Sequence, residues 1–370
     1  MKTDLDRRRM RARCVRALQR YATWGLVSVA AFMLFGGLPW LVWKGPYVLD
    51  SKYIDIETVG DGTGSAALVT GLRTALVACV AALGAGIALF YTARNYRLTR
   101  RGQVTERFTK ALERLGSDEI YVRIGGILAL EQIVQDAPDQ ATDAAHVLGH
   151  FIRHRAPAAD PAAPTADEAG SRVGKPQAPD ADVQAALTAL TRHESRTHVD
   201  PREILDLRGL CLAGARLNSA DLTGAVLDGT DLTGSEMNQA KLTGARLNEA
   251  ILSGARLMLA NLNGSRLNDA DLSGAGLNKA DLSGAQLDRA DLTGAGLNDA
   301  DLSGAGLVNA KLAGAGLNRA NLSGSRLNGA DLSGAGLNKA DLSGAQLDGA
   351  DLTGAGLDGA DLSGTGLGGA

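Results

Sequence analysis

The ten residues ADLSGAGLNK, at Ala270–Lys279, represent a pattern that repeats throughout the C-terminal part of the chain. From Leu207 to Leu367 every fifth residue is Leu, with Met237 as the one substitute, which makes 33 consecutive pentads. A period of five fits neither an α-helix nor a flat strand, whose side chains recur every 3.6 and 2 residues. It does fit a coil that turns a corner every five residues. Four pentads would then complete one square turn of twenty residues.

Two columns of the repeat are expected to form its core, namely the Leu at the centre of each pentad and the residue two positions earlier, which is mostly Ala. The other three positions vary among polar residues and Gly, which is typical of residues that face water. Gly at alternate corners would supply a tight turn or a positive φ without steric cost. The predicted core residues include Leu222, Leu242, Leu262, Leu282, Leu302, Leu322, Leu342, Leu362, Ala220, Ala280 and Ala300.

The A-(D/N)-L-X-X pattern of Leu205–Ala370 resembles the pentapeptide-repeat family. The resemblance implies a right-handed quadrilateral parallel β-helix over 205–370, so that the fold class is mainly a β solenoid preceded by helices. The segments ERFTKALERLG at Glu106–Gly116 and VRIGGILALE at Val122–Glu131 are similar to the region before the repeats in membrane-anchored bacterial members. Those members have two N-terminal transmembrane helices. The similarity assigns no role to the segment.

Two apolar stretches near the N-terminus are long enough to cross a bilayer. Residues 24–43 run from one Trp to another without a charge, and residues 74–91 form a second predicted span. A hydrocarbon core of about 30 Å needs about 20 apolar residues. Ala78, Ala82 and Gly86 recur every four residues on one face of the second span, which predicts close helix packing. That packing would join either the two spans or two protomers.

The distribution of basic residues predicts the orientation of this transmembrane hairpin. The segment 1–23 is rich in Arg and four Arg lie within 94–101, whereas the loop at 44–73 holds mostly acidic charges. The positive-inside rule then places both termini in the cytoplasm and the loop outside the cell membrane. A cleaved secretory signal is the alternative, but Lys44–Tyr47 offers no small-residue cleavage site, which favours an uncleaved anchor.

Three segments connect the predicted spans to the repeats. Residues 92–155 carry helical apolar spacing and predict a small cytoplasmic helical module. Residues 156–182 are rich in Ala, Pro, Asp and Gly, which predicts a disordered linker. Residues 183–199 predict a short helix and a lead-in to the first coil.

The residues of the chain give little support for catalysis or for a cofactor. His146, His150 and His154 recur every four residues, but three such His span about 12 Å of helix, so a solvated or membrane-proximal face is favoured over a metal site. The three Cys show neither disulfide nor metal-ligand spacing. The Asp residues of the repeat would stand on an open convex surface, where no apolar pocket raises their pKa. We therefore predict no enzyme, no cofactor and no metal.

Three functions are compatible with this organisation. The favoured one is a non-enzymatic scaffold, held in membrane lipid, whose rigid coil presents flat faces to an unidentified cytoplasmic protein. The family resemblance implies an alternative, because some members mimic duplex DNA and bind type II topoisomerases. A weaker alternative is a transmembrane signalling protein that senses through the loop at 44–73.

The basic segment at 1–23 could touch nucleic acid, but beside a membrane span the topology and the lipid headgroups explain it more simply, so nucleic acid is not expected as a partner. The charge of the repeat region argues against DNA mimicry. Residues 205–370 hold 17 Asp and 2 Glu against 4 Lys and 8 Arg, which gives a formal charge of −7. Lys241, Lys311 and several Arg interrupt any extended anionic surface.

The repeat continues to Ala370 without a capping segment, and an open coil edge can pair with another chain. We therefore expect an end-to-end homodimer of the isolated coil.

Overall fold

The structure is a computed structural model that describes residues 36, 37, 40, 63–159, 178–200 and 202–369. The chain divides into two compact units, Met1–Arg101 and Gly102–Ala370. The predicted segment 1–23, nearly all of the predicted span at 24–43, most of the loop at 44–73 and most of the linker at 156–182 lie outside the described residues.

The helix α3, Thr63–Leu115, is 53 residues long. It begins within the predicted loop at 44–73 and continues, as one helix, through the predicted second span into the predicted helical module at 92–155. The reason is local: residues 63–115 contain no Pro and are rich in Ala, Leu and Arg. Within it, Val77–Tyr96 has a mean hydropathy of 1.6 and is unburied, and it is the one membrane-span candidate among the described residues.

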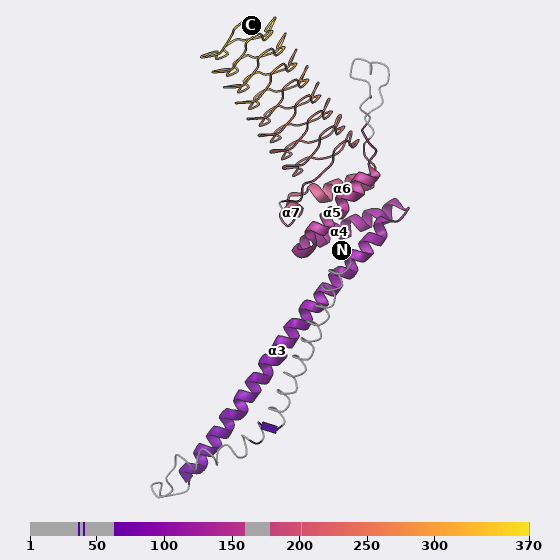
Figure 1. The fold of residues 1–370 in the computed structure, drawn as a ribbon, viewed down its shortest axis with the longest axis vertical. Coiled ribbons are helices and arrows are strands. Elements are labelled where there is room, and N and C mark those ends of the chain that lie inside the picture. Colours follow the sequence, from indigo (N-terminus) through magenta and orange to yellow (C-terminus); the bar gives the residue numbers. More distant parts are fainter. Residues whose placement is uncertain (1–35, 38–39, 41–62, 160–177, 201, 370) are drawn as a thin grey trace, which may run out of the picture. The chain divides into compact units, whose positions relative to one another are not determined.

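Four shorter helices follow: α4 (Ile120–Asp136), α5 (Pro138–Arg155), α6 (Ala181–Thr191) and α7 (His193–Arg196) (Figure 1). Helices α4, α5 and α6 pack on one another around fully or almost fully buried side chains. The buried side chains between these three helices are Ile127, Leu130, Leu148, Ile152 and Leu187. Gly126 permits a close approach of α4 to the end of α3, because a Cβ there would lie 2.9 Å from the Ala111 carbonyl oxygen.

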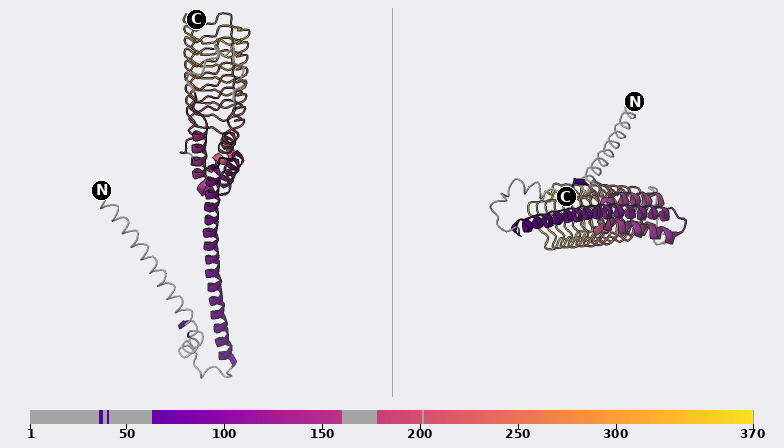
Figure 2. Two further views of the ribbon diagram at one scale, coloured as in Figure 1. Left: turned by 90° about the vertical axis from the view of Figure 1, so that its right-hand side faces the viewer. Right: turned by 90° about the horizontal axis from the view of Figure 1, so that it is seen from below.

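The C-terminal region is a coil of parallel β-bridges with a repeat of 20 residues. The bridges run from Asp206↔Val226 to Gln346↔Gly366, and each joins residues 20 apart. Figure 2 shows the coils stacked as successive layers. Each layer is tied to the next by backbone hydrogen bonds, as from the Leu282 N–H to the Asp301 carbonyl at 2.7 Å. The prediction of a twenty-residue turn is therefore confirmed.

The core of the coil is a column of Leu and Ala side chains. The exposed fraction is 0% for Leu222, Leu242, Leu262, Leu282, Leu302, Leu322 and Leu342, and it is 4%, 1% and 1% for Ala220, Ala280 and Ala300. Leu362 is only partly buried, because it lies in the last described coil and has no further layer above it. The buried residues of the helices and of the coil form one continuous core.

The corners of the coil differ from the expectation that alternate corners depend on Gly. Gly corners have positive φ, as at Gly274 with 64°, but so do the corners between them, as at Lys279 with 60°. Eleven residues other than Gly adopt this left-handed conformation. From Leu212 to Leu362 the corners are closed by a short hydrogen bond, as from the Ala280 N–H to the Leu277 carbonyl at 3.0 Å. The repeated bonding between coils therefore imposes a backbone that these side chains disfavour by about 1–2 kcal/mol each.

The helices cover the N-terminal edge of the coil. The carboxamide of Gln184, on α6, accepts a hydrogen bond from the Arg216 N–H at 2.9 Å and donates one to the Arg216 carbonyl at 2.8 Å. The Asp221 N–H donates to the Thr191 carbonyl at 2.7 Å, and the Cys211 N–H to the Pro157 carbonyl at 2.8 Å. Residues 156–159, at the start of the predicted linker, therefore pair with the first coil, and α6 begins at Ala181 rather than at the expected Val183.

Candidate functional site: the surface of the coil

The coil has four sides, each named here after one central Leu. The Leu222 side comprises residues 221–224, the Leu227 side 226–229, the Leu232 side 231–234 and the Leu257 side 256–259, each with its equivalents at intervals of 20 residues. In this order the Leu222 and Leu232 sides are opposite one another, as are the Leu227 and Leu257 sides. Outward side chains are thus sorted into columns by their position in the sequence.

On the Leu222 and Leu232 sides, Asp side chains accept hydrogen bonds from backbone N–H groups two residues later. The Ser283 N–H donates to Asp281 Oδ1 at 3.0 Å, and the Thr293 N–H donates to Asp291 Oδ1 at 3.0 Å. Hydrogen bonds from Thr353 likewise hold the pKa of Asp351 below its usual value. These turns explain why Asp two residues before Ser or Thr recurs in the repeat. The same bond is made at Asp221, Asp231, Asp271, Asp301, Asp331, Asp341, Asp351 and Asp361.

On the other two sides, Asn and Asp side chains form ladders from coil to coil. On the Leu257 side the Asn298 N–H donates to Asn278 Oδ1 at 2.9 Å, and the Asn318 N–H donates to Asn298 Oδ1 at 3.1 Å. The Leu227 side has equivalent bonds, such as from the Val308 N–H to Asp288 Oδ1 at 3.0 Å. These ladders satisfy outward N–H groups that no carbonyl reaches. Sequence reasoning missed them, although Asn or Asp directly after Leu in alternate pentads is their signal.

Among the described residues, three rungs of the ladders are missing. One lies between the Asn268 N–H and Asn248 Oδ1, which has no hydrogen-bond partner there, and the other two are missing for a chemical reason. Met258 and Val308 occupy ladder positions, but neither side chain carries an oxygen. Within the described part of the chain, the N–H groups of Asn278 and Asn328 accordingly find no acceptor. On the Leu257 side the ladder otherwise continues from Asn218 to Asp358.

Charge is distributed unequally over the four sides. The Leu222 and Leu232 sides each carry five Asp and one Lys, and the Leu227 side carries six acidic and five basic residues. The Leu257 side is the one with excess positive charge. Its basic residues are Arg216, Arg256, Lys279, Arg319 and Lys339, and its acidic residues are Glu236, Asp299 and Asp358.

Ion pairs between coils neutralise part of this charge. Arg289 lies 2.6 Å from Asp269, Arg319 lies 2.6 Å from Asp299, and Lys311 lies 3.3 Å from Asp291. Hydrogen bonds from Arg289 and from Arg319 hold the pKa values of Asp269 and Asp299, respectively, below their usual range. The surface of the coil is therefore a mosaic of charges rather than a continuous anionic stripe.

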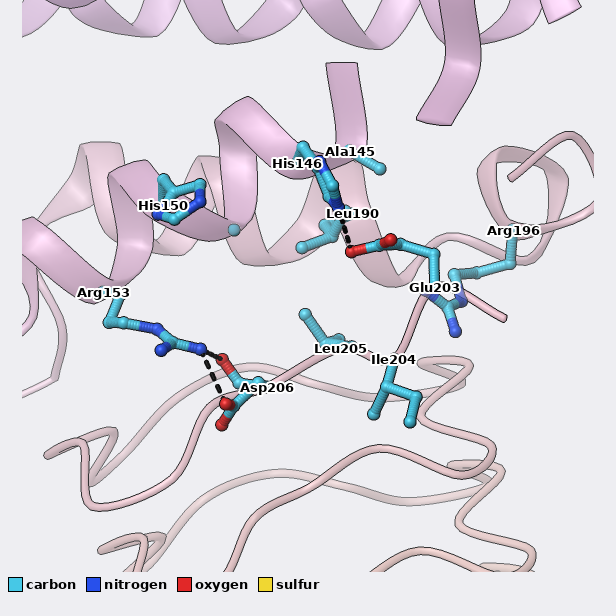
Figure 3. Close-up of a pocket in the computed structure, with 11 residues that line it drawn as sticks. Ala145, His146, His150, Arg153, Leu190, Arg196, Glu203, Ile204, Leu205 and Asp206 are labelled. Atoms are coloured by element: carbon cyan, nitrogen blue, oxygen red, sulfur yellow. Dashed lines mark hydrogen bonds and ion pairs between the residues drawn. The ribbon is translucent and has the colours of Figure 1, made fainter. Parts of the chain in front are cut away.

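A small cavity of about 90 Å³ lies between α5 and the start of the coil (Figure 3). Arg153 Nη2 contacts Asp206 Oδ2 at 2.8 Å, and His146 Nε2 pairs with Glu203. The rings of His146 and His150 are 6.4 Å apart in an edge-to-face arrangement. Among the described residues, no group of three or more His, Cys, Asp or Glu side chains is arranged to hold a metal ion. The polar groups of this cavity connect α5 to the first coil.

A buried ion pair joins α4 to α6. Arg123 Nε lies 2.6 Å from Asp182 Oδ2, and the Asp182 side chain has no exposed surface. Arg123 also donates to the carbonyls of Ser117 and Asp118, and Asp182 Oδ1 accepts from the Val183 N–H. Because both charges are hydrogen-bonded on several sides, this pair is a structural element of the helical cap.

The small residues predicted to pack on another helix lie on an exposed stretch of α3. Ala78, Ala82 and Gly86 are exposed, and a Cβ at Gly86 would meet nothing within 4 Å. Their role in helix packing stays a prediction.

Comparison with known proteins identifies the repeat region. The family model described as pentapeptide repeats matches in eight copies, which together cover residues 206–369. No curated protein matches the chain.

Three solved structures illustrate the similarity. HetL from the cyanobacterium Nostoc, a pentapeptide-repeat protein involved in the regulation of heterocyst differentiation, is 42% identical over 44% of this chain and 76% of its own, with a TM-score of 0.34. A pentapeptide-repeat protein of the Arabidopsis thaliana thylakoid lumen is 35% identical over 25% and 65%, with a TM-score of 0.25. QnrB1, a plasmid-mediated fluoroquinolone resistance protein, is 19% identical over 45% and 84%, with a TM-score of 0.31.

Members of this family fold as right-handed β-helices, and the bridges between residues 20 apart agree with that fold. The family model matches the residues that form the coil. The chain belongs to the pentapeptide-repeat family.

Proposed function

We propose that the protein is a non-enzymatic scaffold that is anchored in the cell membrane and presents its coil to a protein partner in the cytoplasm. The observation that carries this proposal is the continuity of α3. One helix contains both the unburied apolar window Val77–Tyr96 and the residues near Ala111 that pack against α4. An apolar window of this length without protein cover is suited to lipid.

The polar residues of α3 support the same interpretation. The hydroxyl groups of Thr74 and Thr92 donate to the carbonyls of Thr70 and Ala88, four residues earlier, at 2.9 and 2.8 Å. This bonding satisfies hydroxyl groups inside an apolar helix. The cluster of Arg at 94–101 then supports a cytoplasmic location for everything that follows.

The chemistry of the coil supports binding rather than catalysis. General acid catalysis requires a carboxyl group with a raised pKa. The shifted carboxyl groups of the coil have lowered pKa values instead, as at Asp351, because Thr353 donates hydrogen bonds to it, and at Asp299, because Arg319 does. The covered N-terminal edge and the two ladders give the coil a fixed shape, which favours selective contact with a partner.

The anchoring is tested by fractionation of a chain that begins at Thr63 and therefore lacks the predicted first span. We expect this chain to stay with the membrane after carbonate extraction. Replacement of the exposed Leu83 and Leu89 by Arg is expected to release it, since a charged residue in a span costs about 2.5–3.5 kcal/mol. The matched control is Leu128→Arg on α4, also exposed, which should leave the chain in the membrane fraction.

The orientation is tested with reporters fused after Ala370 in the full chain. A fluorescent protein that folds in the cytoplasm should be active, and alkaline phosphatase should not. A soluble wild-type chain, or an active phosphatase at this position, would reject the proposal.

A further inference from the structure

The Leu257 side carries an apolar pair that departs from the repeat. Met258 and Leu259 are 48% and 47% exposed. In other coils the position of Met258 is Asn or Asp, and the position of Leu259 is polar or Gly. Two adjacent large apolar side chains, both about half exposed, therefore form a small apolar patch on an otherwise polar side.

Both residues are placed at a cost to the fold. Met258 interrupts the ladder, so the Asn278 N–H has no acceptor within the described residues. Leu259 has a φ of 60°, a left-handed conformation that a side chain of this size disfavours. Residues that break local rules without a gain in stability mark places where function is expected.

Two basic side chains flank the pair. Arg256, two residues before Met258 on the same side, has a side chain that is 70% exposed, although its guanidinium lies 3.5 Å from Glu236 Oε1 and is partly neutralised by it. Lys279 is the equivalent of Leu259 in the next coil and is exposed. Carboxylates dominate the two neighbouring sides, with five Asp to one Lys each, so positive charge is a property of this side.

The side beyond the pair is flat and permits a close approach. Gly occupies the outward position that precedes Leu in five successive coils. The ladder holds the neighbouring Asn side chains against the surface, since a Cβ at Gly296 would lie 3.2 Å from Asn278 Nδ2. The five residues are Gly276, Gly296, Gly316, Gly336 and Gly356.

We propose that Met258 and Leu259 anchor an acidic segment of a partner protein on the Leu257 side. An apolar side chain of that segment packs on the pair, its carboxylates lie near Arg256 and Lys279, and one of its oxygens accepts the open Asn278 N–H. This inference rests on the proposed function, because it names the surface and the chemistry of the partner that the scaffold binds. Nucleic acid is disfavoured, since the anchor is aliphatic and offers no aromatic ring on which a base could stack.

The test uses the full chain, purified in detergent, and a phage-displayed library of random 16-residue peptides as the probe. Recovered peptides are synthesised, and their affinity is measured by fluorescence anisotropy. The variant is Met258→Asn with Leu259→Gln, which restores the residues of the preceding coil. The matched control is Val308→Asn, which supplies an acceptor for the Asn328 N–H in the ladder on the opposite side.

We expect recovered peptides to be rich in Asp and Glu and to contain a large apolar residue. Their affinity should fall at least about tenfold in the double variant, as for the loss of a central contact, and stay unchanged in Val308→Asn. Misfolding does not explain such a loss, because the double variant is expected to be at least as resistant to urea as the wild type. The fold-loss in affinity caused by the double variant should stay the same when the salt concentration is raised, whereas the loss caused by Lys279→Glu should shrink, because salt screens exposed charges.

The inference is overturned if no peptide is recovered, if the peptides are not acidic, or if the double variant binds them with wild-type affinity. It is also overturned if a 20-base-pair DNA duplex binds the chain and loses affinity in the double variant. None of these readouts depends on membrane insertion. If the peptide experiment fails while the fractionation and reporter experiments give the expected results, the proposed binding surface is rejected and the proposal of a membrane-anchored scaffold is retained.

Discussion

Three Ser hydroxyl groups lie inside the coil without a hydrogen-bond partner. Ser235, Ser265 and Ser325 occupy positions that are Ala in most pentads, and each is 0% exposed. Ser265 stands between Ala245 and Ala285 in its column, both fully buried. A buried hydroxyl without a partner costs about 1–3 kcal/mol. Because Ala fits this column, Ser265→Ala is expected to raise the free energy of unfolding by about 1–3 kcal/mol.

The effect of a second replacement should add to the first. Ser325 lies in the same column, three coils later, which is about 14 Å at about 4.8 Å for each coil. Sites separated by more than about 10 Å contribute independently. The double variant is therefore expected to gain about 2–6 kcal/mol, and each kcal/mol should raise the melting temperature by about 2–4 °C.

Thr230 is the matched control, because it is also buried in an Ala-type position but its hydroxyl donates to the Leu207 carbonyl at 2.8 Å. Thr230→Ala should lower the free energy of unfolding by about 0.5–1.5 kcal/mol. The assay is urea unfolding of the compact unit Gly102–Ala370, followed by circular dichroism. A loss of stability in Ser265→Ala, or changes of the same sign at both sites, would refute the reasoning about unsatisfied hydroxyl groups.

Three further predictions concern the surface and the edge of the coil. Val308→Asn should supply an acceptor for the Asn328 N–H and raise the free energy of unfolding by about 0.5–1.5 kcal/mol in urea, whereas Val308→Ala should not; an equal gain in both would contradict the ladder. Gln184→Leu should remove both hydrogen bonds to Arg216, lower the free energy of unfolding by about 1–3 kcal/mol and speed hydrogen exchange of the Arg216 amide. Unchanged exchange would show that α6 does not protect the N-terminal edge of the coil. The folded pKa of Asp299 lies below the ordinary 3.8, because Arg319 donates a hydrogen bond to its carboxylate. Such carboxyl groups therefore contribute to the stability of the fold above about pH 4, and this contribution is lost as the pH falls through the folded pKa values. A melting temperature that rises on acidification would contradict this sign.

The core of the fold could be predicted because it depends on a strict period. Leu at every fifth position has one geometric solution that buries all of these side chains, and the bridges at intervals of 20 residues follow from it. The corners were predicted less well. Expecting Gly at the special corners ignores that cooperative bonding between coils can hold residues such as Lys279 at positive φ.

The surface features required the register of the coils. The bond from the Asn298 N–H to Asn278 joins residues 20 apart, and no local propensity indicates such a pair. The cap is a similar case, because Gln184 and Arg216 lie 32 residues apart and their pairing depends on how α6 meets the first coil. Met258 and Leu259 become unusual only when each is compared with its own column rather than with its neighbours in the chain.

The register also relates two nearly identical segments of the coil. Arg266–Leu297 and Arg326–Leu357 are the same sequence apart from two positions, and they are 60 residues apart, which is three whole turns. The two differences are Asp269 and Arg289 in one segment against Gly329 and Gly349 in the other, so the two members of one ion pair changed together. A duplication of whole turns keeps every column in phase, whereas insertion of a single pentad would rotate all later residues by a quarter turn. A protein of this kind can therefore lengthen by multiples of 20 residues while each column of side chains stays on the same side of the coil.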